Sequence, residues 1–162
     1  MRPAVATVRT PAPDRPALVG GGACRNRRTQ VEKLGWPPEL AESFQTKTRE
    51  AFPDAEVAGY ESLLPALSND PKDRHVLAAA IRSNCPLILT FNLKHFPVEA
   101  LKPWDICASH PQDYLLVLYE MERQQVAACL GEIAGKRKIE VQDVLIRLGK
   151  TLPSFAQRLL DD

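Results

Sequence analysis

Hydrophobic residues in the first half of the chain fall into short runs whose spacing changes from helical to strand-like. After a proline pair, Leu40, Phe44 and Ala51 recur at helical intervals and predict a helix that the next proline ends. Residues 55–59 form a short β-leaning run closed by a glycine, and residues 60–67 are expected to form a short helix. This part of the chain therefore predicts a helix, a strand and a second helix in turn.

The alternation is clearest in the middle of the chain. Apolar residues at helical spacing begin just after Asp73 and predict a helix that Asn84 and Pro86 end. The continuous apolar run 87–89 is typical of a buried parallel strand, and a further strand is expected over residues 105–108. Helices that alternate with strands across short connections predict an α/β fold, in which a parallel sheet is flanked by helices.

Beyond Pro111 the pattern is helical only. Apolar stripes over residues 113–133 and 141–150 predict helices, and Gly131 and Gly135 are expected to break the first of them. A few helices of this size cannot bury a core alone, so they are expected to pack on the α/β part or to form a small helical appendage.

Residues 1–24 differ from the rest of the chain in amino-acid composition. Prolines and the run Gly20–Gly22 disfavour a core element, and Ala4–Val8 is the one strand-like stretch among them. We therefore predict a disordered or unrelated leader over residues 1–24, a partial α/β domain over residues 25–118 and a helical extension over residues 119–162.

Composition excludes several classes of protein. Hydrophobic residues make up 44% and charged residues 25%, the ordinary mixture of a soluble globular protein. No apolar run reaches the ~20 residues of a membrane span, so no membrane is expected and the predicted location is cytoplasmic. The four cysteines form no C-x-x-C pair or zinc pattern, and reduced thiols are expected. Glycine-rich nucleotide loops, G-x-S-x-G and H-E-x-x-H are all absent.

Charge is uneven along the chain. The net charge is +1, but residues 1–30 hold six arginines and one aspartate, a balance of +5. Such an arm can bind nucleic acid phosphates, or it can be a solvated tail, which its composition favours.

Polar side chains gather where the predicted strand 87–89 ends. Thr90, Asn92 and His95 follow this strand, while Asp70 and Asp73 precede the helix before it. Sites in parallel α/β sheets lie beyond the carboxyl ends of the strands. Carboxylate and amide oxygens suit a hard cation such as Mg²⁺ or Mn²⁺, which can activate water for phosphodiester cleavage. Helix capping is the alternative role of the two aspartates.

Two motifs carry a resemblance to a known family. The runs D-R-H-V-L-A-A-A at 73–80 and L-I-L-T-F-N-L-K-H-F-P at 87–97 resemble PIN domains, and in particular VapC-type ribonuclease toxins with an extra helical segment at the C-terminus. Residues 53–61 and 109–116 fit the same subgroup, so the resemblance runs from about Arg25 to the C-terminus.

The resemblance implies an α/β PIN-like fold of three layers and a Mg²⁺- or Mn²⁺-dependent endoribonuclease. It further implies an RNA substrate, a cognate antitoxin protein and, as an expectation still open, a homodimer. Asp73 matches the family's metal carboxylate at the helix start, and Asn92 matches its polar residue after the strand. By this reading Asp73 and Asn92 are catalytic, Asp70 is a further metal ligand, and Thr90 and His95 support the site.

The sequence also departs from the family. The family's opening strand, which ends in an aspartate, and a later glutamate have no counterpart here, and His95 stands where an aspartate is usual. We hypothesise that residues 1–24 are an unrelated leader of the kind that a frameshift or wrong start gives. A ribonuclease with impaired cleavage, a module that only binds RNA or antitoxin, and a truncated gene remnant all stay open.

Overall fold

The computed structural model describes residues 7–9, 16–19, 30–32, 35–52 and 56–162. The chain divides into two compact units, Met1–Ser109 and His110–Asp162, which we call the N-terminal and C-terminal units. The dividing point after Ser109 lies earlier than residue 118, the end of the α/β domain that the sequence pattern predicts, because the helix that follows His110 packs within the C-terminal unit.

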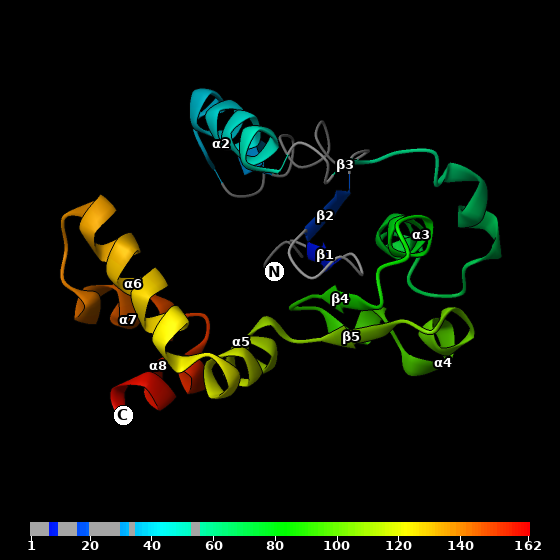
Figure 1. The fold of residues 1–162 in the computed structure, drawn as a ribbon. Coiled ribbons are helices and arrows are strands. Elements are labelled where there is room, and N and C mark those ends of the chain that lie inside the picture. The colour runs from blue at the N-terminus through cyan, green and yellow to red at the C-terminus, as the bar shows by residue number, and fades with distance from the viewer. Residues whose placement is uncertain (1–6, 10–15, 20–29, 33–34, 53–55) are drawn as a thin grey trace. The chain divides into compact units, whose positions relative to one another are not determined.

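A five-stranded mixed sheet forms the centre of the N-terminal unit, in the order β3-β2-β1-β4-β5 (Figure 1). The strands are β1 Thr7–Arg9, β2 Pro16–Val19, β3 Glu56–Val57, β4 Leu87–Leu89 and β5 Cys107–Ser109. The pairs β2–β3 and β4–β5 are parallel, whereas β1 runs antiparallel to both of its neighbours. Only the outer pairs therefore have the parallel pairing that the sequence predicts.

The helices of this unit connect and cover the strands. They are α2 Pro38–Ala51, η2 Glu61–Ala66, α3 Arg74–Arg82, η3 Leu93–His95, α4 Val98–Leu101 and η4 Lys102–Trp104, where η marks a 3-10 helix. Helix α3 packs on β2 and β4, and α4 packs on β5. The short β5 begins later than expected because Asp105, at φ 54°, turns the chain in a left-handed conformation just before it.

The core of the unit forms where α3 meets the sheet. Val76–Ala80 of α3 are all buried, and Leu77 and Ile88 are fully inaccessible to solvent. Three consecutive alanines leave little side-chain bulk on α3, so the helix can approach the strands closely. The α/β architecture that the sequence predicts is confirmed.

Two strands of the sheet lie inside residues 1–24. β1 overlaps the apolar run Ala4–Val8, and β2 follows it in an antiparallel pair. Residues 1–6, 10–15 and 20–24 lie outside the described residues, and so does the larger part of the predicted leader. The origin of this segment stays a prediction.

Four helices make up the C-terminal unit, α5 Pro111–Met121, α6 Arg123–Arg137, α7 Val141–Gly149 and α8 Pro153–Leu160. They pack in a closed circuit, since α5 contacts α6 and α8, and α7 contacts α6 and α8. The expectation that Gly131 and Gly135 break the first helix is wrong, because α6 runs through both. The break falls earlier, at Glu122. Along the described part of the chain, each helix is too short or too polar to cross a bilayer.

Candidate metal centre

The first half of the site is the turn that leads into α3. Asp73 occupies the N-cap position of α3, yet its side chain makes no capping hydrogen bond. Asp70 does serve the turn, since its Oδ1 accepts a hydrogen bond from the backbone N–H of Lys72 at 2.9 Å. Capping is the ordinary role of an aspartate at a helix start. The Asp73 carboxylate is therefore left for another contact.

The second half is the loop that follows β4. Thr90 is fully buried, and its backbone N–H donates to the carbonyl of Ser109 at 3.0 Å, which extends the pairing of β4 with β5. The Oγ1 of Thr90 accepts a hydrogen bond from the backbone N–H of Asn92 at 3.0 Å. The backbone N–H of His95 donates to the Asn92 carbonyl, also at 3.0 Å. Thr90 thus supports the loop, and the loop presents Asn92 and His95.

Three polar side chains meet at the imidazole of His95. Its Nδ1 lies 2.6 Å from Oδ2 of Asp73 and 2.6 Å from Nδ2 of Asn92. Its Nε2 lies 3.7 Å from Oδ2 of Asp70. The side chains of His95, Asp73 and Asp70 are 15%, 17% and 32% exposed, so the cluster is partly shielded but reachable from solvent. Of the candidate residues, the structure brings Asp70, Asp73, Asn92 and His95 together. Thr90 instead binds the backbone N–H of Asn92.

A backbone hydrogen bond also joins the two halves of the site. The N–H of Asp70 donates to the carbonyl of His95 at 3.4 Å. The turn before α3 and the loop after β4 are therefore connected through main-chain atoms as well as through side chains.

Asn69 is a buried polar residue that the sequence pattern does not single out. It is 2% exposed, and among the described residues neither its Oδ1 nor its Nδ2 finds a hydrogen-bond partner. A buried amide without partners costs about 1–3 kcal/mol. The backbone carbonyl of Asn69, by contrast, accepts a hydrogen bond from Nε of Arg74 at 3.3 Å. The only signal in the sequence is its place in the polar turn 68–71, where burial is not the usual expectation.

The donor atoms of the cluster fit a divalent cation. Asp70, Asp73 and His95 each offer one ligand atom, and these atoms lie within 4.8 Å of one another. A neutral imidazole has one ring proton, so Nδ1 either donates to Asp73 or accepts from Asn92, and cannot do both. With the Asn92 amide turned so that its oxygen faces the ring, Nδ1 can donate to Asp73 and the conflict disappears. The two carboxylates and the imidazole together form a donor set that could hold a divalent ion.

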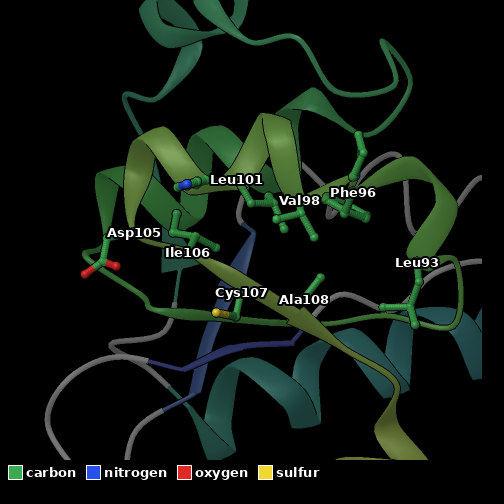
Figure 2. Close-up of a pocket in the computed structure, with 10 residues that line it drawn as sticks. Leu93, Phe96, Val98, Leu101, Asp105, Ile106, Cys107 and Ala108 are labelled. Atoms are coloured by element: carbon green, nitrogen blue, oxygen red, sulfur yellow. The ribbon is translucent and has the colours of Figure 1, made fainter.

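An apolar pocket of about 490 Å³ lies elsewhere in the N-terminal unit, between β5 and the α4–η4 segment (Figure 2). Leu93, Phe96, Val98, Leu101 and Ile106 are among the ten residues that line it. None of the four clustered residues lines it. Among the described residues, the group of side chains that could hold a metal ion lies outside this pocket lining.

Comparison with known proteins identifies the family of this chain. No protein-family model matches the chain, and no solved structure matches it. A protein of Mycobacterium tuberculosis (strain ATCC 25618 / H37Rv), named "Putative ribonuclease VapC50", is 39% identical over 140 residues, which cover 85% of this chain and 80% of that protein. At this identity and coverage, the chain belongs to the VapC family of ribonuclease toxins.

Proposed function

We propose that this chain is a PIN-type endoribonuclease, the toxin of a toxin–antitoxin pair, which cleaves RNA phosphodiesters with Mg²⁺ or Mn²⁺. Its family supports the ribonuclease part, since the mycobacterial relative is named as a ribonuclease. One observation carries the metal-dependent part. One potential ligand atom from each of Asp70, Asp73 and His95 lies within 4.8 Å of the others.

Each clustered residue has its own task in this proposal. Asp70 and Asp73 would hold the ion with carboxylate oxygens, together with the Asn92 amide oxygen and a ring nitrogen of His95. When bound, the ion supplies positive charge that lowers the pKa of an attacking water and neutralises the phosphate. Thr90 fixes the backbone of Asn92 and so orients the amide. The partial burial of the carboxylates strengthens their attraction for a cation.

Two exposed lysines flank the cluster, one on each half of the site. Lys72 lies between the two aspartates in sequence, and Lys94 lies just before His95. Ammonium groups beside a nuclease centre can contact RNA phosphates, which position the strand without reading its sequence. We therefore assign RNA backbone binding to Lys72 and Lys94.

Membership of the VapC family also implies an antitoxin partner. An antitoxin that covers the cluster would block access of RNA to Asp73, which is how we expect it to control the toxin. A homodimer and a cytoplasmic location complete the proposal. Light scattering on the purified chain measures its mass and so tests whether it forms a homodimer.

A second candidate function is a module that binds RNA or antitoxin without cleavage. In the portion of the chain described by the structure, the group of side chains that could hold a metal ion contains two carboxylates and one histidine. The family resemblance leads us to expect more acids there, and an aspartate in place of His95. Fewer negative charges attract a hard dication less strongly, which favours binding without catalysis.

Cleavage of a 5′-labelled random-sequence RNA pool by the purified full chain tests the proposal. We expect fragments with Mg²⁺ or Mn²⁺ and none with EDTA. Asp73→Asn should slow cleavage at least about 100-fold, because several kcal/mol of transition-state stabilisation depend on the ion. Asp143→Asn is the matched control, since Asp143 is an exposed aspartate in the first turn of α7.

The other outcomes separate the alternatives. RNA that is bound but left intact under every metal condition selects the binding module. A chain that shows no cooperative thermal unfolding selects the gene remnant. Cleavage that survives Asp73→Asn unchanged rejects the proposed site.

A further inference from the structure

The histidine at the centre of the cluster bears on which metal the site holds. We propose that His95 makes this site selective for a transition-metal ion that accepts a nitrogen ligand, Mn²⁺, Co²⁺ or Zn²⁺, over Mg²⁺. The inference rests on the proposed metal-dependent function and specifies the ion of the same site.

His95 is built into the cluster rather than attached to its edge. Both ring nitrogens face a carboxylate, Nδ1 towards Asp73 and Nε2 towards Asp70. The backbone of His95 is held from both sides, because its N–H bonds to the Asn92 carbonyl and its carbonyl accepts from the N–H of Asp70. A cation held by both aspartates would therefore lie beside the imidazole.

The chemistry of the donors sets the preference. Mg²⁺ demands oxygen ligands in near-octahedral geometry and gives up its waters reluctantly. Imidazole suits the later first-row ions, whose affinity for nitrogen and oxygen donors generally rises from Mn²⁺ to Co²⁺ and is also high for Zn²⁺. A neutral ring in place of a carboxylate also removes one negative charge. That loss weakens Mg²⁺ binding most, since the attraction of Mg²⁺ is largely electrostatic.

Calorimetric titration of the metal-free full chain with Mg²⁺, Mn²⁺ and Zn²⁺ measures the preference. We expect Zn²⁺ and Mn²⁺ to bind at least about tenfold more tightly than Mg²⁺. His95→Asp should reduce the ratio of Zn²⁺ to Mg²⁺ affinity by at least about tenfold, since disturbing even an outer partner of a metal ligand typically costs that much. His110→Asn is the control, because His110 caps α5 through the N–H of Gln112 and belongs to the C-terminal unit.

Pulsed electron paramagnetic resonance of the Mn²⁺-loaded chain gives a readout that does not depend on activity. We expect modulation from a bound ¹⁴N nucleus in the wild type, retained in His110→Asn and lost in His95→Asp. A folded His95→Asp variant, judged by its circular dichroism, shows that the loss of signal is local.

The outcomes distinguish this inference from the proposed function. Equal affinities for Mg²⁺ and Mn²⁺, a missing ¹⁴N signal, or no metal binding at all overturns the inference. If the two affinities are equal but RNA is still cleaved with Mg²⁺, the inference is rejected and the proposed ribonuclease function is retained. Selective, nitrogen-ligated metal binding without RNA cleavage supports the inference and rejects the catalytic proposal.

Discussion

Replacement of Leu77 by alanine tests whether α3 and the sheet form the core that holds the site. Leu77 is fully buried in α3, the helix that begins directly after Asp73. The change removes three carbon atoms, and at about 0.8 kcal/mol for each buried group this costs about 2.4 kcal/mol. A residual cavity adds to this figure, because close-packed surroundings relax only in part. We therefore expect the unfolding free energy to fall by about 3 kcal/mol.

Tryptophan fluorescence during urea unfolding measures this loss of stability in the N-terminal unit, which contains Leu77. Both tryptophans of the chain, Trp36 and Trp104, belong to the N-terminal unit, so their signal reports on it. With a slope of about 2 kcal/mol per molar urea, a loss of 3 kcal/mol lowers the midpoint by about 1.5 M. Val98→Ala is the control, since Val98 is 69% exposed and its truncation should cost less than about 0.5 kcal/mol. Equal midpoints for the two variants would refute the packing described for α3.

Two further predictions concern the C-terminal unit. Hydrogen bonds from Arg158 and Tyr119 hold the pKa of the Asp162 carboxyl below its usual value. The carboxylate therefore stabilises the fold above the unfolded pKa, and this contribution disappears as the pH falls through the lower, folded pKa. Thermal melts followed by circular dichroism should lose stability below about pH 4, and Arg158→Gln should lose less over the same range. Separately, Gly131→Ala should raise stability by about 0.5–1 kcal/mol in the same melts, because a Cβ there meets no atom within 4 Å and glycine is costly inside a helix.

The predictions for Asp162 and for Gly131 can each be contradicted by a specific result. Identical acid profiles for Arg158→Gln and the wild type would show that the ion pair contributes nothing to the pH dependence. For the glycine, Gly59→Ala is the opposite control, since Gly59 has φ +74° and a side chain is strained there. The same sign of effect at both glycines would be inconsistent with the helix described for α6.

The sequence predicted the centre of the fold well because the signals there are local. A buried alanine-rich helix and a short apolar strand have patterns that few other structures share, and both form as expected. It also predicted that Asp73, Asn92 and His95 would lie near one another, since a helix start and a strand end can meet at one edge of a sheet. Their chemical roles stay predictions.

Other features depend on contacts that a sequence pattern does not encode. The antiparallel β1 is paired with β4, far along the chain, and the prolines around it disfavour a strand by local criteria. The helix α6 continues through Gly131 because packing of the surrounding helices outweighs the low helix propensity of glycine. The burial of Asn69 likewise results from tertiary structure rather than from its own residue type.

The main-chain bond between Asp70 and His95 has a consequence for how this protein can evolve. Because neither of its atoms belongs to a side chain, the frame survives when one liganding residue is exchanged for another. Under the proposed metal-binding role, single codon changes could then alter which ion the site prefers, without loss of the loops that present the clustered side chains. The variant His95→Asp would be a change of this kind.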